Sequence, residues 1–437
     1  MPSALSPIHK LDDLLLWRIF TFNNTLYHGP QPEDKWQAIQ HPVAVVKDHD
    51  PLTTTRQCSQ VCEFWRDIIL SSPYIWSFID LESLVQENDA WRNEVLRRSG
   101  GALLTIHGRC MADIPQNFLR KLLRDYWNRI QVIDVQMSTF QFRNGEIIAA
   151  IGHPAPHLRA FVVLSALDNT NVFNEEEFPF FPDFDLFGGE APSLVCFSIA
   201  GNTFHLVYHT TIAMLSSMPI RELTLNSAGT FTCTDVLSAL AEMPHLEALS
   251  LGVALVIQDD QLGRIVDLYL PHLKRLSIIG FHPMLYSAFL ERIIPHPACA
   301  LMPHSIPPFL NFYLPLKSVE VLYTAPRDLA HMMQWAPEGT VLFPKLSVVA
   351  ISFWNSRDDN LATVKSFLIA RTIKAPIQLL IIPLWESLSD LQLFDDLPGL
   401  TIIMRCGTSK EGQRKIVEYT CGSGSTPVPQ EEISLGA

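Results

Sequence analysis

Apolar residues recur with helical spacing in two segments near the start of the chain. Leu11, Leu15 and Ile19 are four residues apart, and Leu16 with Phe20 widens the stripe, which predicts an amphipathic helix over 11–20. A second apolar stripe predicts one helix over 56–70, and Ser71-Ser72-Pro73 should end this helix. The residues of the stripe are Cys58, Val61, Cys62, Trp65, Ile68 and Ile69. Residues 21–51 contain four prolines and no period, so we expect a loop insertion.

A different pattern fills the rest of the chain. A Leu or Ile is followed by apolar residues at +3 and +5, and seven of the eight instances have a proline one or two residues before the first position. The alternation predicts a short strand that buries its +3 and +5 side chains. The instances are Ile130/Ile133/Val135, Leu158/Phe161/Val163, Leu194/Phe197/Ile199, Ile220/Leu223/Leu225, Leu246/Leu249/Leu251, Leu273/Leu276/Ile278, Leu316/Val319/Val321 and Leu346/Val349/Ile351.

Helical stretches are expected between these strands, for example over 234–243 and 261–270. Alternating strands and helices predict parallel strands, each unit burying its apolar face against its neighbours. Residues 376–382 and 398–403 are expected to add one or two further strands.

Three segments break this rhythm. Residues 173–190 mix phenylalanines with acids and are interpreted either as a binding loop or as phenylalanines folded back on the repeats. Residues 281–315 hold seven prolines and are expected to form an irregular loop with one short helix near 285–294. The tail from Gly422 is expected to be disordered.

Composition narrows the possible functions. Apolar residues make up 48% of the chain and the net charge is −13, so we expect neither nucleic acid nor an anionic membrane as a partner. The chain has no run of 18 apolar residues and its first residues do not resemble a secretory signal. We therefore expect an intracellular protein, cytoplasmic, nuclear or both, and its eight scattered cysteines agree with a reducing compartment.

Candidate chemistry is sparse. The chain has none of the common nucleophile, phosphate-binding, dinucleotide-binding or zinc-protease motifs. Cys58 and Cys62 lack further metal ligands nearby and are interpreted as core residues. The histidines and the pairs Asp259-Asp260 and Asp358-Asp359 are interpreted as surface or turn residues. We expect no enzyme activity, no cofactor and no metal.

The segment Leu11 to Phe20, followed by V-C-x-x-W-R-x-I from Val61 and then Ser72-Pro73-Tyr74-Ile75-Trp76, resembles an F-box, particularly the F-box-like proteins of mushroom-forming fungi. Trp91 and Arg97-Arg98-Ser99-Gly100 resemble the continuation of that family. The phased L-x-x-L-x-L pattern resembles the leucine-rich repeat.

These resemblances imply a fold of class α + α/β. A small helical F-box-like module (8–80, with the insertion at 21–51) would precede connecting helices and a first unit (81–128). An irregular leucine-rich-repeat solenoid, with parallel strands on one face and helices on the other, would cover 129–406. A C-terminal tail would cover 407–437.

The resemblance also implies a function: a non-catalytic substrate receptor of a ubiquitin ligase. The module would bind a Skp-type adaptor and through it a cullin, and the solenoid would bind an unknown protein substrate. The adaptor-binding candidates are Leu11, Leu14, Leu15, Ile19, Phe20, Val61, Cys62, Trp65, Ile68 and Trp76. The substrate-binding candidates, outward positions between buried strand residues, are Glu222, Thr224, Ser250, Arg275, Ser277 and Glu320.

Two departures, together with the insertion at 21–51, keep an alternative open. Asp12 stands where the family usually has Pro, and Leu14 where it usually has Glu. The alternative is a repeat protein that acts as an interaction scaffold without coupling to a ligase.

Overall fold

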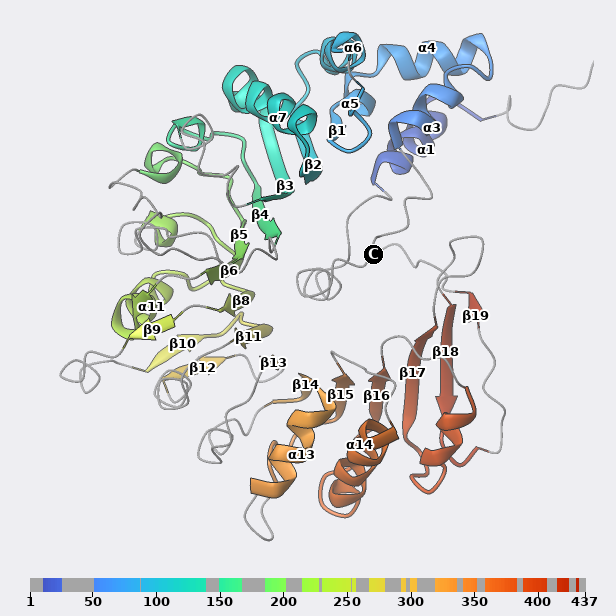
Figure 1. Ribbon diagram of the computed structural model, residues 1–437, viewed down its shortest axis with the longest axis vertical. Helices are drawn as coiled ribbons and strands as arrows, with labels where there is room; N and C mark the ends of the chain where they lie inside the picture. Colours follow the sequence, from blue (N-terminus) through green and yellow to red (C-terminus); the bar gives the residue numbers. More distant parts are fainter. Residues whose placement is uncertain are drawn as a thin grey trace, which may run out of the picture. The chain divides into compact units, whose positions relative to one another are not determined.

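The computed structural model describes residues 11–25, 51–86, 88–138, 149–166, 185–201, 214–227, 230–252, 254–256, 267–279, 292–295, 299–304, 319–335, 341–351, 358–382, 388–406, 415–423 and 430–431. The chain divides into two compact units, Met1–Ile220 and Arg221–Ala437. Figure 1 shows the helices and strands of both units.

Unit 1 begins with four short helices: α1 (Asp13–Thr25), α3 (Pro51–Cys58), α4 (Glu63–Ser71) and α5 (Pro73–Trp76). We call residues 11–25 and 51–76 the helical module. The prediction of one helix over 56–70 is wrong, because α3 ends at Cys58 and Cys62 is extended, with φ −156° and ψ 168°. The Cys62 thiol accepts a hydrogen bond from the Trp65 backbone N–H at 3.5 Å and so caps α4. The predicted stripe is therefore shared between two helices.

Two indole groups fasten the helices of the module. Trp76 is buried and donates its Nε1–H to the Ile69 carbonyl at 2.8 Å, which joins α5 to α4. Trp17 donates its Nε1–H to the Ser72 hydroxyl at 2.8 Å, which joins α1 to the start of α5. Pro73 at the first turn of α5 needs no backbone donor there, which explains why the helix restarts at this residue.

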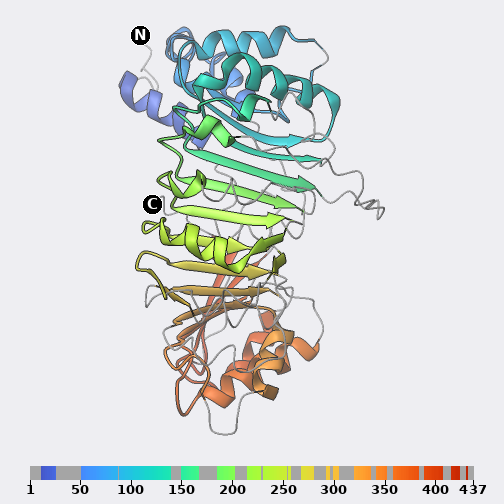
Figure 2. The ribbon, with the colours of Figure 1, turned by 90° about the vertical axis from the view of Figure 1, so that its left-hand side faces the viewer.

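A parallel sheet follows in unit 1. Its strands pair in chain order: β1 (Phe78–Asp80), β2 (Leu104–Cys110), β3 (Ile130–Ser138), β4 (Ala160–Ala166) and β5 (Cys196–Gly201). In Figure 2 the teal and green strands of this unit lie side by side. One register row places Ile106, Ile133, Phe161 and Phe197 next to each other, all buried. The helices α6 (Ala90–Ser99) and α7 (Asp113–Tyr126) and the short 3-10 helices Trp127–Arg129 and Leu186–Gly189 complete the unit.

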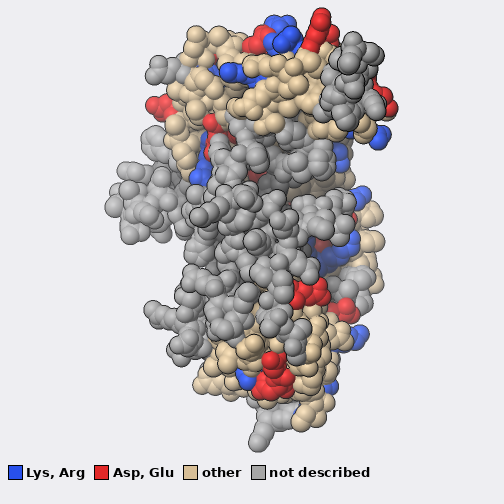
Figure 3. Space-filling view, turned by 90° about the vertical axis from the view of Figure 1, so that its right-hand side faces the viewer, with Lys and Arg blue, Asp and Glu red and all other residues tan. Residues whose placement is uncertain are grey.

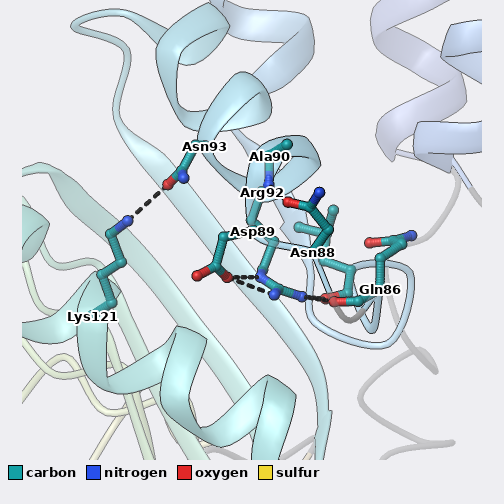
Figure 4. Close-up of polar contacts among 8 residues, drawn as sticks. Gln86, Asn88, Asp89, Ala90, Arg92, Asn93 and Lys121 are labelled. Carbon is teal, nitrogen blue, oxygen red and sulfur yellow. Dashed lines mark hydrogen bonds and ion pairs between the residues drawn. The ribbon is translucent and has the colours of Figure 1, made fainter.

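A buried arginine holds the start of α6. The Arg92 side chain donates through Nε to Asp89 at 2.8 Å and through Nη1 to the carbonyl groups of Leu84, at 2.9 Å, and Gln86 (Figure 4). These bonds satisfy carbonyl groups of the segment between β1 and α6 that have no ladder partner. Lys121 of α7 donates to Asn93 of α6 at 2.7 Å, so the two helices are also tied to each other.

Unit 2 contains eight parallel strands that pair in chain order. They are β6 (Glu222–Ser227), β8 (Ala248–Leu251), β11 (Arg275–Ile279), β13 (Ala300–His304), β14 (Val321–Thr324), β15 (Val348–Ile351), β16 (Leu379–Ile382) and β17 (Thr401–Cys406). The antiparallel strands β18 (Lys415–Thr420) and β19 (Gln430–Glu431) follow β17. Two small parallel ladders join β7 (Thr230–Thr232) to β9 (Ala254–Val256) and β10 (Leu268–Leu270) to β12 (Ile293–Pro295).

Helices lie beside the sheet of unit 2. They are α11 (Cys233–Ala241), α13 (Pro326–Trp335), α14 (Asp358–Arg371) and the 3-10 helix Leu388–Phe394. The helices α13 and α14 pack against each other and lie on the same side of the strands β14 to β16 (Figure 1). Their apolar residues recur at helical spacing and are buried, for example Leu329 and Met332 in α13 and Leu361, Val364 and Leu368 in α14.

The predicted repeat pattern holds along most of the chain. The +3 and +5 residues whose side chains are described are buried in all instances except Leu316/Val319/Val321. There the phase is wrong by three residues: Val321 and Leu322 pair with Val348 and Val349, so Val319, Leu322 and Thr324 hold the buried positions. The predicted strands near 376–382 and 398–403 are confirmed as β16 and β17, and the helix at 234–243 as α11.

Other expectations are wrong in part. The segment 281–315, expected to be a loop, contains β12 and β13, so Ile293 and Ile294 are in a strand and not in a helix. Residues 268–270 are likewise a strand, although 261–270 was expected to be helical. In the tail from Gly422, which was expected to be disordered, residues 430–431 form β19, whereas β18 precedes this segment. Of the 173–190 segment the structure describes 185–190, where Phe187 is buried; the remainder lies outside the described residues.

Within the described residues, every helix is too short or too polar to cross a lipid bilayer.

Candidate protein-docking surfaces

Exposed apolar side chains gather on the helical module. Seven large apolar residues there expose between 37% and 63% of their surface: Leu14, Leu15, Ile19, Val61, Phe64, Leu70 and Tyr74. Figure 3 looks onto the side of the molecule where α1, α3 and α4 lie, and in the upper part of that view uncharged surface is interspersed with charges of both signs. Several exposed apolar side chains on one small module are typical of a protein-docking site. We call these seven residues the apolar docking surface.

The helix α1 has one face in the core and one face outside it. Leu16 and Phe20, one turn apart, are buried, and the Phe20 ring meets the Trp65 ring edge to face at 5.1 Å between centroids. Leu15 and Ile19, also one turn apart, are exposed. The sequence of α1 therefore has two apolar stripes. Leu16 and Phe20 form the stripe that is buried, and Leu15 with Ile19 forms the stripe that stays exposed.

Asp12 fixes the start of α1. Its carboxylate accepts a hydrogen bond from the Leu15 backbone N–H at 2.7 Å, and its carbonyl accepts one from the Leu16 N–H at 3.0 Å. This is the geometry of an N-cap residue, which satisfies a backbone donor that the first turn leaves open. Asp12 therefore has a structural role in forming the helix that carries Leu14, Leu15 and Ile19.

The other exposed residues come from the α3–α4 turn and from the end of α4. Val61 lies in the turn just before the Cys62 cap, and Phe64 follows in the first turn of α4. Tyr74 lies against Trp17, with 6.2 Å between ring centroids, and more than half of its surface remains exposed. The turn that breaks the predicted helix thus exposes Val61, which the sequence pattern assigned to the same stripe as buried Ile69.

The predicted adaptor-binding residues fall into three groups. Leu14, Leu15, Ile19 and Val61 are exposed, and Leu11, Cys62, Trp65 and Ile68 are half-buried. Phe20 and Trp76 are buried and belong to the core, so they offer no surface for docking. The structure adds Phe64, Leu70 and Tyr74. Phe64, Leu70 and Tyr74 lie outside the apolar stripe of the sequence, so periodicity gave no signal for them.

The predicted substrate-binding residues also divide. Glu222 and Arg275 form an ion pair at 3.0 Å. They share a register row with Ala248, which lies between them, so the small side chain leaves room for the bridge. Glu320 is half-exposed just before β14. Thr224, Ser250 and Ser277 are buried, contrary to the expectation that they face outward.

A polar row, which no pattern in the sequence indicates, crosses the sheet of unit 1. Parallel pairing places Asp80, His107 and Asp134 next to each other. The imidazole of His107 lies against the Phe78 ring at 4.2 Å, and the Asp80 carboxylate accepts from the Glu82 N–H at 2.9 Å. Asp80 and His107 are buried, so these contacts stabilise the first strands. Only the strand register reveals this row, because its members are far apart in sequence.

Two findings on the described residues concern metal binding and thiol chemistry. They contain no group of three or more His, Cys, Asp or Glu residues able to hold a metal ion. Burial raises the pKa of the Cys110 and Cys299 thiols to about 12. Both remain neutral near pH 7, whereas a nucleophilic cysteine needs a lowered pKa.

Comparison with known proteins adds no relative. No protein-family model matches the chain, and no curated protein matches it either. The fold itself, short N-terminal helices followed by parallel strands that alternate with helices, is compatible with a repeat solenoid of the leucine-rich type.

Proposed function

We propose that this chain is a non-catalytic substrate receptor of a cullin-type ubiquitin ligase. The helical module docks on a Skp-type adaptor, and the repeat strands and their loops hold the protein to be modified. The observation that carries the proposal is the apolar docking surface: half of the large apolar side chains exposed in the described chain lie within residues 14–74.

The energetics of this surface favour a bound partner. Covering a half-exposed Leu, Ile or Phe side chain contributes roughly 1 kcal/mol. The seven residues together therefore supply several kcal/mol, which offsets a substantial part of the cost of association. Exposed charges of both signs surround them, including Asp13, Arg18, Arg66 and Asp67, and such a rim sets the orientation of a partner more than its affinity.

Repeat architecture supports the receptor half of the proposal. Stacked parallel strands form an extended surface that grows with the number of units and suits a protein ligand better than a small molecule. Among the predicted substrate-binding residues, Glu222, Arg275 and Glu320 are the accessible ones, and we assign them to substrate contact together with the loops that follow the strands.

The test is co-expression of the full chain with a Skp-type adaptor, followed by size-exclusion chromatography. We expect a 1:1 complex with the parent chain and none with the double variant Leu15→Glu/Ile19→Glu. The control is Ile373→Glu, which changes an apolar residue of unit 2 that is more exposed than Leu15 and Ile19 and should leave the complex intact. Circular dichroism melting must show that both variants fold.

Point variants suit this test better than a truncation. Removing residues 1–80 would also remove Trp76 from the core and β1 from its pairing with β2, so loss of binding would not distinguish docking from unfolding. A folded parent chain that elutes without the adaptor would contradict the ligase proposal. The repeats would then stand as an interaction scaffold.

A further inference from the structure

Five polar residues line up at the start of three neighbouring strands of unit 2. They are Arg221, His245, Glu247, His272 and Lys274, which we call the histidine–cation patch. Arg221, Glu247 and Lys274 immediately precede β6, β8 and β11. The backbone N–H of Glu247 donates to the Arg221 carbonyl at 2.7 Å, and that of Lys274 donates to the Glu247 carbonyl at 2.8 Å, so the three residues are neighbours in space.

One carboxylate in this patch serves two cations. Glu247 accepts from Lys274 Nζ at 2.8 Å and lies 3.4 Å from Arg221 Nη1. The Lys274 hydrogen bond lowers the pKa of Glu247, against the opposing effect of its partial burial, so the carboxylate stays ionised. Two positive charges against one negative charge leave the group with an excess positive charge.

The two histidines extend the patch. His245 lies two residues before Glu247, and His272 lies two residues before Lys274; each histidine directly follows a proline. The centroids of the two imidazole rings are 5.9 Å apart. Both side chains are exposed, as are Arg221 and Lys274. An imidazole carries at least one N–H in either protonation state, so each ring can donate to an anionic oxygen. The patch therefore combines the exposed cations Arg221 and Lys274 with two imidazole groups that can donate hydrogen bonds.

The excess positive charge is local. The corresponding positions before β13, β14, β15 and β16 are Cys299, Glu320, Ser347 and Gln378, none of which is a cation. The whole chain carries a net charge of −13, which repels polyanions in general. An acidic ligand that binds this chain is thus directed to the few places where cations are in excess.

We propose that the histidine–cation patch binds an acidic segment of a partner polypeptide, with its carboxylates accepting hydrogen bonds from Arg221, Lys274 and the two imidazoles. The neighbouring Glu222–Arg275 ion pair, 3.0 Å long, adds one charge of each sign and leaves this excess unchanged. A short run of carboxylates fits better than nucleic acid, because a long polyanion would extend onto the acidic remainder of the chain. The inference concerns unit 2 alone and holds whether or not the helical module couples to a ligase.

The experiment measures fluorescence anisotropy of a labelled decaglutamate peptide titrated with the full chain at low ionic strength. We expect saturable binding that weakens about tenfold in Arg221→Gln/Lys274→Gln and also in His245→Gln/His272→Gln. The matched control is Lys345→Gln/Lys374→Gln, which removes two exposed lysines elsewhere in unit 2 and should keep the parent affinity. Glu247→Gln removes the internal competitor and should tighten binding.

Three results would overturn the proposal. The first is the absence of saturable decaglutamate binding by the parent chain. The second is an equal loss of affinity in the Lys345/Lys374 control, which would show dependence on net charge alone. The third is equally tight binding of decathymidylate that is lost in the same patch variants, since that would make the patch a general polyanion site. Adaptor binding by the same variants should stay unchanged, which keeps this result separate from the docking test.

Discussion

The rings of Phe20 and Trp65 meet edge to face, with 5.1 Å between their centroids, and this contact joins α1 to α4. Phe20 is buried and Trp65 is half-buried. The pair therefore sets the position of α1, and Leu15 and Ile19 lie on the neighbouring, exposed face of the same helix. The core of the module and the α1 part of its docking surface are thus two faces of one short helix.

Trp65→Ala should destabilise the helical module. A fully buried aromatic truncated to alanine costs about 3–5 kcal/mol, and partial exposure reduces the expected cost to about 2 kcal/mol. Urea denaturation followed by far-ultraviolet circular dichroism measures it. Trp65→Phe is the control, because it keeps an aromatic ring against Phe20 and should lose less than half as much. Equal stability of the alanine variant and the parent chain would contradict the packing described for α1.

Asp12→Ala should fray the first turn of α1 and weaken adaptor binding. The carboxylate accepts from the Leu15 N–H at 2.7 Å, and loss of such a cap costs about 1 kcal/mol. Hydrogen exchange of the Leu14 to Leu16 amides measures the fraying directly. Asp13→Ala removes the same charge one residue later, inside the helix, and should cost only a few tenths of a kcal/mol through the helix dipole. Equal exchange rates in both variants would exclude a capping role for Asp12.

The repeat strands could be predicted from the sequence because their buried positions are local. In Leu246/Leu249/Leu251 the spacing of two and three residues alone identifies the inward side chains, and Pro244 marks the turn before them. The phase at Leu316 could not be predicted in this way. Both Leu316/Val319/Val321 and the observed Val319/Leu322/Thr324 contain apolar residues, and the second includes a buried threonine that an apolar pattern rejects. Only pairing with β15 decides between them.

Depth of burial was the harder property to predict for the candidate sites. Strand alternation places Thr224, Ser250 and Ser277 on the side of the sheet opposite the leucines, yet all three are buried. In the helical module, Ile19 and Phe20 are consecutive residues that both belong to the predicted apolar stripe of α1. Phe20 is in the core, whereas Ile19 is exposed. A periodic pattern gives the direction of a side chain, whereas its exposure depends on segments distant in the sequence.

The stability of unit 2 should fall above about pH 9, in part through the buried thiol of Cys299. Burial raises the pKa of Cys299 to about 12, so the unfolded chain loses this proton before the folded chain does. The stabilisation from the neutral thiol is complete below the unfolded pKa and is lost as the pH rises toward the folded value. The effect at about pH 10 is on the order of 1 kcal/mol.

Cys299→Ala tests this directly. The variant should show a smaller loss of unfolding free energy between about pH 8 and about pH 10, measured by guanidinium denaturation at each pH. Val349→Ala is the matched control, because it truncates another buried residue of unit 2 without removing an ionisable group. Its cost should be the same at both pH values. A parallel pH dependence in the parent chain and in the cysteine variant would rule out the thiol as the cause.

A chain that ends at residue 414 should self-associate. The strand β18 pairs antiparallel with β17 over all six residues of both strands, and the Tyr419 hydroxyl donates to Asp395, whose carboxylate also accepts from the Gly422 N–H at 3.1 Å. Without β18, the N–H and C=O groups along one side of β17 would be left unpaired, and an unpaired edge strand recruits another chain. Light scattering after size exclusion should show dimers or larger species for the truncated chain and not for Tyr419→Phe. The substitution loses about 1–2 kcal/mol with the hydroxyl but keeps the strand, so it separates edge protection from simple destabilisation. A truncated chain that stays monomeric and folded would show that β18 does not protect this edge.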